Sequence, residues 1–291
     1  MKPPPFAYHR AESLEHALVL LDEHADDAKV IAGGQSLLPM MALRLARPEV
    51  LVDIGRLPGL ADLHINGTGV EIGALVTHDQ LEHLNAADAD PRTVLRHAAG
   101  HIGHRPIRTR GTFGGSLAHA DPSAEWCVLA VALDAQLAIH SSAQTRVEDA
   151  TDFLQGPFWS SLAENEIVTS VRIGAFPDAA GFDEYSRRHG DFAIVLAAVA
   201  YDLHDGAIAN ARVVLGGIGP TPLRITEAER VLDGQVASPE VFREAAATVR
   251  REIDPPSDTV SAAYRRRLSE ALVERAALRA SGIELDTRSH R

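Results

Sequence analysis

Apolar positions near the amino terminus repeat every three or four residues, which predicts a helix over residues 13–25 with Ser13 as its N-cap. Three further segments in the first fifty-odd residues are predicted as a strand, a helix and a strand: 29–32, 37–46 and 50–54. This is a β-α-β pattern. It is too short for an independent domain of average size, so we expect it to dock on the middle of the chain.

The middle of the chain continues this mixed α/β pattern, with a basic, glycine-rich loop predicted at residues 103–116. Alternating apolar positions or short apolar runs predict strands at 70–75, 136–140 and 166–173. Helical spacing predicts helices at 77–85, 91–102 and 123–135. Phe176-Pro177-Asp178 then marks a boundary.

The last part of the chain has a different pattern. Two long apolar segments, 192–203 and 207–216, flank Asp205-Gly206, and an Asp-Gly pair is a strong hairpin signal. Three helices are predicted after them, at 224–232, 239–250 and 261–280. Helices on one face of an antiparallel sheet make this part α+β. We therefore expect an α+β protein in three units: 1–56, 57–176 and 177–291.

Composition and charge exclude several classes of protein. With 45% hydrophobic and 23% charged residues, the chain of 291 residues can bury a core and is not disordered. Its 40 acidic and 28 basic residues give a net charge of −12, so we expect no nucleic-acid partner. No apolar run is long enough to span a membrane, and the start lacks an apolar signal core, so we expect a cytoplasmic protein.

The chain has one cysteine, Cys127. A single thiol cannot form an iron–sulfur cluster, a disulfide or a thiolate zinc site within the chain. His97, His101 and His104 lie at helical spacing that can bind a metal, but Gly100, Gly103 and Pro106 weaken a helix there. We therefore predict no metal site.

Two glycine pairs are the most informative motifs: Ala32-Gly33-Gly34-Gln35-Ser36 and Thr112-Phe113-Gly114-Gly115-Ser116. Glycine lets a backbone approach a phosphate closely, and consecutive N–H groups can then point at its oxygens. At about 1.5–3 kcal/mol for each hydrogen bond to a charged group, four or five such donors hold a pyrophosphate without a lysine. Ordinary turns are the alternative. Neither motif is a P-loop or a Rossmann fingerprint.

Residues 32–41 (AGGQSLLPMM) and 107–122 (IRTRGTFGGSLAHADP) resemble the two flavin loops of FAD-binding medium subunits of the molybdenum hydroxylase family, of the aerobic carbon monoxide dehydrogenase and xanthine dehydrogenase type. Later stretches agree with the resemblance: 188–193 (RHGDFA), 217–222 (GIGPTP) and 264–268 (YRRRL). The resemblance covers essentially the whole chain. It implies a two-part FAD-binding domain of the PCMH (vanillyl-alcohol-oxidase) type, followed by the C-terminal domain of carbon monoxide dehydrogenase flavoproteins.

The resemblance also implies which residues bind FAD, and that none of them is catalytic. Those around the pyrophosphate would be Ala32, Gly33, Gly34, Gln35, Ser36, Thr112, Phe113, Gly114, Gly115 and Ser116. Lys29, Val30 and Ile31 would line the same groove, and Ile102 and Val168 would make apolar contacts. Glu125 would hydrogen-bond the adenosine end, and Phe192 would lie near the isoalloxazine. Core packing alone is the alternative for Ile102, Val168 and Phe192.

Some positions depart from the family pattern. Many relatives have His or Asn at Gln35, Ile at Phe113 and Asn at Ser116. Relatives also often carry a lysine in the region where this chain has Asp183 and Glu184.

The function implied by the resemblance is electron transfer. A large subunit would carry the molybdenum cofactor and a small subunit two [2Fe-2S] clusters, and FAD in this chain would pass their electrons to an external acceptor. The expected assembly is a dimer of heterotrimers. The alternatives are a free-standing FAD-dependent oxidase and a catalytically silent flavin-binding assembly module.

Overall fold

The structure is a computed structural model that describes residues 2–283. Its amino-terminal unit is a parallel sheet in the order β1-β3-β2, covered by helix α1 (Leu14–His24). The strands of this sheet are β1 (Ala7–Arg10), β2 (Ala28–Ile31) and β3 (Val50–Asp53). The predicted N-cap is confirmed, because the Ser13 hydroxyl accepts a hydrogen bond from the His16 N–H at 3.1 Å. A 3-10 turn at Ala25–Asp27 leads into β2.

Helix α2 (Leu37–Ala42) ends four residues before its predicted end at 46. Just beyond it, Arg44 has a φ of 61°, a left-handed conformation that cannot continue an α-helix.

The middle unit is built on an antiparallel sheet in the order β4-β5-β10-β6-β7. Its strands are β4 (Leu63–Asn66), β5 (Gly69–Gly73), β6 (Gln136–His140), β7 (Thr145–Asp149) and β10 (Ile167–Ile173). The helices are α3 (His78–Glu82), α4 (Thr93–His101), α5 (Arg105–Arg108), α6 (Phe113–His119), α7 (Glu125–Ala132) and α8 (Ala150–Phe153). A small hairpin, β8 (Leu154–Gly156) and β9 (Trp159–Ser160), completes the unit.

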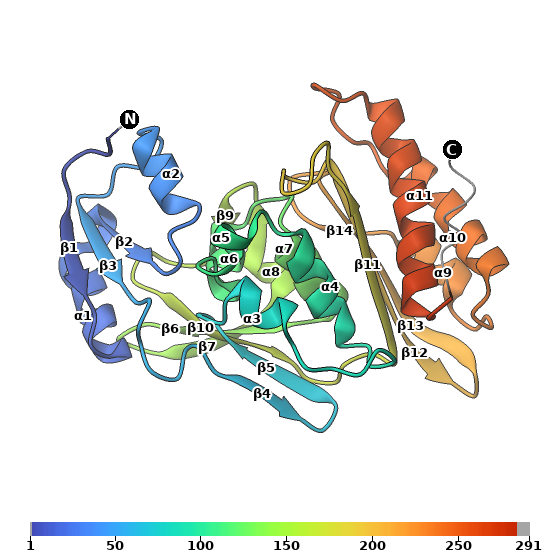
Figure 1. The fold of residues 1–291 in the computed structure, drawn as a ribbon, viewed down its shortest axis with the longest axis horizontal. Coiled ribbons are helices and arrows are strands. Elements are labelled where there is room, and N and C mark those ends of the chain that lie inside the picture. The colour runs from blue at the N-terminus through green and yellow to red at the C-terminus, as the bar shows by residue number, and fades with distance from the viewer. Residues whose placement is uncertain (1, 284–291) are drawn as a thin grey trace.

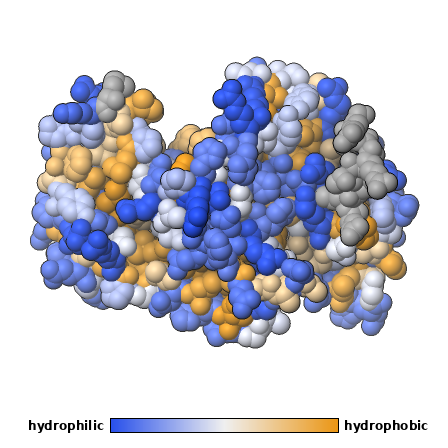
Figure 2. Space-filling view, in the orientation of Figure 1, coloured by the Kyte–Doolittle hydropathy of each residue, from blue (hydrophilic) through white to orange (hydrophobic). Residues whose placement is uncertain are grey.

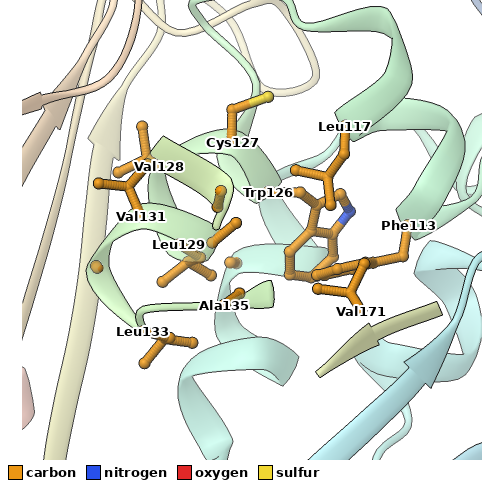
Figure 3. Packing of buried hydrophobic residues seen from close by; sticks show 14 of the residues in the cluster. Phe113, Leu117, Trp126, Cys127, Val128, Leu129, Val131, Leu133, Ala135 and Val171 are labelled. Atoms are coloured by element: carbon orange, nitrogen blue, oxygen red, sulfur yellow. The ribbon is translucent and has the colours of Figure 1, made fainter. Parts of the chain in front are cut away.

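Helix α7 is the centre of the middle core. After Glu125, all of its residues from Trp126 to Ala132 are buried, which explains why the segment is apolar on every face. Figure 3 shows the Trp126 side chain beside Phe113, Leu117 and Val171.

The carboxy-terminal unit is a meander in the order β11-β12-β13-β14, with three helices on one face (Figure 1). Its strands are β11 (Ala179–Tyr185), β12 (Val195–His204), β13 (Ala207–Gly216) and β14 (Leu223–Arg224). The helices are α9 (Thr226–Leu232), α10 (Pro239–Glu252) and α11 (Ala262–Ala280). The predicted α+β fold with three carboxy-terminal helices is confirmed, and so is the hairpin at Asp205-Gly206, where both residues have positive φ.

Strand β12 is apolar from Val195 to Ala200 because both of its faces are buried there. Leu196, Ala198 and Ala200 pack into the middle core, whereas Val195 and Val199 pack against the carboxy-terminal helices. The meander is therefore the layer that joins the two units.

Several elements differ from the prediction. The predicted loop at 103–116 is wrong, because the segment contains α5 and the start of α6. Strands β1, β4, β7 and β11 were not predicted. The first three are short and largely exposed, and β11 carries two carboxylates, so none is an apolar run. Only β4 alternates apolar and polar residues, over four positions from Leu63 to Asn66. No helix within residues 2–283 is long and apolar enough to cross a membrane.

Candidate cofactor site

The two glycine motifs, about eighty residues apart in the chain, meet in the structure. A Cβ atom placed on Gly33 would lie 2.0 Å from the Arg110 carbonyl oxygen and 2.8 Å from the Cα of Gly111. A Cβ atom on Gly115 would lie 3.9 Å from the Cβ of Ala32. The two backbones therefore touch, and a side chain at residue 33 would force them apart.

The first motif is a loop between β2 and α2, and two of its carbonyl groups accept hydrogen bonds from the loop itself and from α2. The Gly33 carbonyl accepts a hydrogen bond from Gln35 Nε2 at 3.0 Å, and the Gly34 carbonyl accepts one from the Leu38 N–H at 3.1 Å. The N–H groups of Gly33, Gly34, Gln35 and Ser36 donate to no acceptor within residues 2–283. Gly34 has a φ of 71°, which only glycine adopts without strain. Consecutive free N–H groups in such a loop form a concave anion site.

The second motif differs from the prediction. Gly114 and Gly115 lie in the first turn of α6 and not in a glycine turn. The N–H groups of this motif already have acceptors within the protein. Those of Phe113 and Gly114 donate to the carbonyl oxygens of Val76 and Ala74, respectively. Those of Gly115 and Ser116 donate to Oγ1 and to the carbonyl oxygen of Thr112, respectively. The second motif therefore offers fewer free donors than the sequence predicts. Its contribution is that its backbone can lie close to the first motif and to a ligand. Gly115 is exposed and Ser116 is half-buried.

A buried group that the sequence did not indicate fixes the second motif. The Trp126 indole N–H donates to His78 Nδ1 at 2.9 Å, and the Trp126 ring lies 4.8 Å from the ring of Phe113. Burial, with the Arg108 charge adding to it, lowers the pKa of His78 to about 4, so this histidine is a neutral acceptor. Its backbone N–H donates to the Gly111 carbonyl at 3.1 Å. No local pattern links residues so far apart, so no sequence signal could have found the group.

Arg108 supports the same segment from the other side. Its Nε donates to Glu82 at 2.7 Å, and its Nη1 donates to the Gly103 carbonyl at 3.0 Å. The guanidinium is buried and bridges α3 to the turn before α5, so it holds the second motif against the middle unit.

The surface is hollowed beside these motifs. Figure 2 shows a deep notch between the amino-terminal unit and the rest of the molecule, where Figure 1 places α2 opposite α5 and α6. The β11–β12 connection rises on the far side of the notch (Figure 1). It approaches His104, the residue before α5, because a Cβ atom on Gly190 would lie 2.7 Å from the His104 ring.

The remaining residues of the predicted site lie in three environments. At the end of β2, Lys29 is exposed and Val30 and Ile31 are half-buried, next to the first motif. Val168 on β10 is 5% exposed and belongs to the middle core, as does the ring of Phe113. Phe192, in the β11–β12 connection, is 73% exposed. Ile102 at the end of α4 and Glu125 at the start of α7 are half-buried.

Comparison with known proteins identifies the family. Residues 4–175 match the family model of the FAD binding domain in molybdopterin dehydrogenase, and residues 180–280 match that of the CO dehydrogenase flavoprotein C-terminal domain. The chain belongs to the FAD-binding medium subunits of the molybdenum hydroxylases. It is thus a subunit of an oxidoreductase, and the resemblance seen in the sequence is confirmed.

The similarity of the medium subunit to individual proteins extends over the whole chain. It is 42% identical over 280 residues to the 6-hydroxypseudooxynicotine dehydrogenase complex subunit alpha of Paenarthrobacter nicotinovorans, with 94% of each chain covered. It is 39% identical to the nicotine 6-hydroxylase medium subunit of the same organism, with 94% of this chain and 97% of the relative covered. A structure of carbon monoxide dehydrogenase from Hydrogenophaga pseudoflava superposes with a TM-score of 0.90 at 34% identity and covers 98% of this chain and 100% of its own.

Proposed function

We propose that this medium subunit holds FAD in the notch between its amino-terminal and middle units and relays electrons through it. The electrons would come from iron–sulfur clusters of a partner subunit and leave to an external acceptor. The observation that supports this most directly is that the N–H groups of Gly33, Gly34, Gln35 and Ser36 donate to no acceptor in the described part of the chain. Consecutive N–H groups of this kind suit the oxygens of a pyrophosphate. Gly33 has no side chain to separate this loop from the backbone at Arg110, so the two segments stay close together. Bound FAD would supply the redox chemistry itself.

The chain's own residues would bind and orient the cofactor. In this proposal the first motif donates backbone hydrogen bonds to the diphosphate, and the second motif closes over it with the half-buried Ser116. Gln35 acts indirectly, because its amide is bonded to the Gly33 carbonyl and so fixes the loop. Lys29 to Ile31 line the groove, Glu125 contacts the adenosine end, and Phe192 covers the isoalloxazine. Ile102 and Val168 support the cofactor through the core against which they pack.

The partners are inferred from the cysteine count. Cys127 is the one thiol of the chain and is buried, so the iron–sulfur clusters must lie elsewhere. We propose a large subunit with the molybdenum cofactor and a small subunit with two [2Fe-2S] clusters, assembled in the cytoplasm as a dimer of heterotrimers. We also propose that residues 1–56, 57–176 and 177–291 act as three structural units. Sedimentation of the native complex, cell fractionation and limited proteolysis test these three points.

The cofactor assignment is tested by FAD titration of the apo chain, followed by flavin fluorescence. Gly33→Ala would place a Cβ within 2.0 Å of the Arg110 oxygen, so we expect the affinity to fall by more than about tenfold, the equivalent of one hydrogen bond to a charged group. The matched control is Gly174→Ala, because a Cβ there meets nothing within 4 Å. Wild-type affinity in Gly33→Ala would contradict the proposed site.

The electron-transfer role needs a separate experiment. The FAD-loaded chain alone should leave a reducing substrate of the complex unoxidised, and flavin reduction should appear when the molybdenum and iron–sulfur subunits are added. Substrate oxidation by the isolated chain would instead support a free-standing oxidase. A flavin that stays oxidised in the full complex would support an assembly module.

A further inference from the structure

The three later motifs of the chain meet at one buried arginine. Arg265 lies in the first turn of α11, and its side chain is 10% exposed. Its Nη1 donates to the carbonyl oxygen of Ile194 at 3.1 Å and to that of Gly217 at 2.5 Å. Ile194 directly follows the stretch 188–193, and Gly217 begins the stretch 217–222. One guanidinium therefore joins segments that lie 48 and 71 residues from it in the chain.

A carboxylate fixes this guanidinium from the other side. Arg265 Nη2 donates to both carboxylate oxygens of Asp258, each at 3.0 Å, in the segment between α10 and α11. Asp258 also accepts the Val260 N–H at 2.9 Å, which closes the turn that carries the carboxylate. The planar guanidinium can bond the carbonyl groups and the carboxylate at the same time, whereas a lysine ammonium cannot reproduce this arrangement.

The arginine is not explained by stability alone. A buried ion pair is weak evidence for stability, because the cost of desolvating the charges offsets their attraction. Arg265 Nε is also buried and has no hydrogen-bond partner within residues 2–283. An unsatisfied buried donor costs free energy. The value of this side chain must therefore lie in the segments that it holds in place.

One of these segments is the β11–β12 connection, residues 186–194. The Ile194 N–H donates to the Tyr185 carbonyl at 2.8 Å, so the two ends of the connection are bonded to each other. The Tyr185 ring lies 6.4 Å from that of Tyr264, the neighbour of Arg265 on α11. Figure 1 places the start of α11 at the same end of the carboxy-terminal sheet as the connection. The first turn of α11 therefore holds both ends of the connection.

The other acceptor links this arrangement to the middle unit. The Gly217 N–H donates to the carbonyl oxygen of Pro122, in the turn between α6 and α7, at 3.0 Å. Gly217 has a φ of 72°, and a Cβ atom there would lie 2.7 Å from the Ile194 oxygen. Only glycine therefore fits between the two carbonyl groups that Arg265 bonds. These bonds place the connection relative to the turn that follows α6.

The connection carries an exposed aromatic side chain, Phe192. Its side chain is 73% exposed, whereas the next residue, Ala193, is buried in the middle core. Since so little of the Phe192 ring is covered, its position depends on the backbone on either side. That backbone is held by Arg265 at Ile194 and by the close approach of Gly190 to the His104 ring.

We infer that Arg265 is a positioning residue for the bound flavin, because it fixes the β11–β12 connection and with it the place of Phe192 against the isoalloxazine. The part that concerns the flavin rests on the proposed function, whereas the fixing of the connection does not. Arg265 acts here through the backbone that it bonds, and its charge is compensated by Asp258.

The fixing of the connection is tested in the apo chain by hydrogen exchange of residues 186–194, measured by mass spectrometry. In Arg265→Lys we expect this exchange to be faster by at least about tenfold, as for the loss of one hydrogen bond to a charged group. The matched control is Arg266→Lys, because this arginine of the same helix also bonds a carbonyl group and a carboxylate, those of Ile253 and Asp254. It should leave exchange in the connection unchanged.

A second variant covers the case in which Arg265→Lys does not fold. Asp258→Asn keeps Arg265 and changes a carboxyl group that is 52% exposed, so we expect a folded chain. Exchange in the connection should rise by about threefold, because the hydrogen bonds that fix the guanidinium become weaker. Asp254→Asn is its control and should have no effect there. Unchanged exchange in the folded variants of Arg265 and Asp258 would overturn the inference.

Iodide quenching of flavin fluorescence tests the link to Phe192 in the FAD-loaded chain. If the connection covers the isoalloxazine, Arg265→Lys and Phe192→Ala should each raise the quenching constant. The double variant should show no further rise over Phe192→Ala, because both changes remove the same cover. A rise that is additive in the double variant would show that Arg265 does not act through Phe192.

The outcomes separate this inference from the proposed function. Faster exchange in Arg265→Lys, with a wild type that binds no FAD, would support the fixing of the connection and refute the proposed function. Faster exchange together with bound FAD whose quenching equals that of the wild type would show that Arg265 is only structural. The positioning role toward the flavin would then be wrong.

Discussion

Gly33 illustrates how a missing side chain defines the site. Its backbone contacts that of Arg110, where even a methyl group would overlap, and the N–H groups of the next three residues have no acceptor among residues 2–283. Gln35, two residues further on, holds the loop through a hydrogen bond from its side-chain amide to the Gly33 carbonyl. Backbone groups thus carry the chemistry at this position, and side chains set their geometry.

This division predicts a modest effect of Gln35→Ala. The variant loses one side-chain hydrogen bond, worth about 1 kcal/mol, so we expect the FAD affinity to fall by about fivefold. FAD titration measures it, with Gln144→Ala in the exposed turn before β7 as the control. A loss as large as that of Gly33→Ala would indicate that Gln35 contacts the cofactor directly.

Helix α6 positions the second motif through its first turn. Thr112 caps this turn by accepting the Gly115 N–H at 3.1 Å. Gly114 lets the turn lie against the segment after β5, because a Cβ there would be 2.5 Å from the Cβ of Ala74. The glycine pair therefore serves helix packing as well as access to the notch.

Removal of this cap should affect both stability and binding. Thr112→Val removes the hydroxyl that accepts this hydrogen bond. We therefore expect the free energy of unfolding, measured by urea denaturation, to fall by about 1 kcal/mol, and FAD to bind more weakly. Ser238→Ala is the matched control, because Ser238 caps the distant α10 in the same way. It should lose similar stability and bind FAD normally. Equal FAD affinity in the two variants would show that the cap is only structural.

Across the whole molecule, two histidines with lowered pKa values lie in packed regions. His78 is buried inside the middle unit, and the half-buried His97 of α4 faces the carboxy-terminal sheet, where its ring meets that of Phe182. Burial lowers both pKa values to about 4, so each histidine is folded in its neutral form.

The stability of the fold should therefore decrease in acid. Because the pKa of each histidine is lower in the folded chain than its ordinary 6.5, their contribution is complete above pH 6.5 and is lost as the pH falls to about 4. The separation for His78 corresponds to about 3 kcal/mol. In His78→Asn, the free energy of unfolding measured with urea should depend less on pH across this range than in the wild type. The Asn amide oxygen can still accept the hydrogen bond from Trp126. The exposed His64→Asn should match the wild type, and an unchanged profile for His78→Asn would refute this account.

Local pattern was sufficient for much of this fold. Ser13 caps the helix that it was predicted to cap, and Asp205-Gly206 forms the predicted hairpin, because each signal acts within a few residues. The resemblance carried by the two glycine motifs also identified the family, since those residues are constrained by close backbone contact.

Tertiary structure decided what each motif does. The sequence predicted two equivalent glycine loops. In the structure the second motif begins helix α6, and the N–H groups of Phe113 and Gly114 donate to Val76 and Ala74 in the turn after β5, so they are not free. The apolar Val168 and Phe113 were assigned to the core by packing that sequence cannot show. The raised pKa of Glu125 is likewise set by tertiary structure, because burial and the charge of Glu184, on a strand of another unit, act through space and not along the chain.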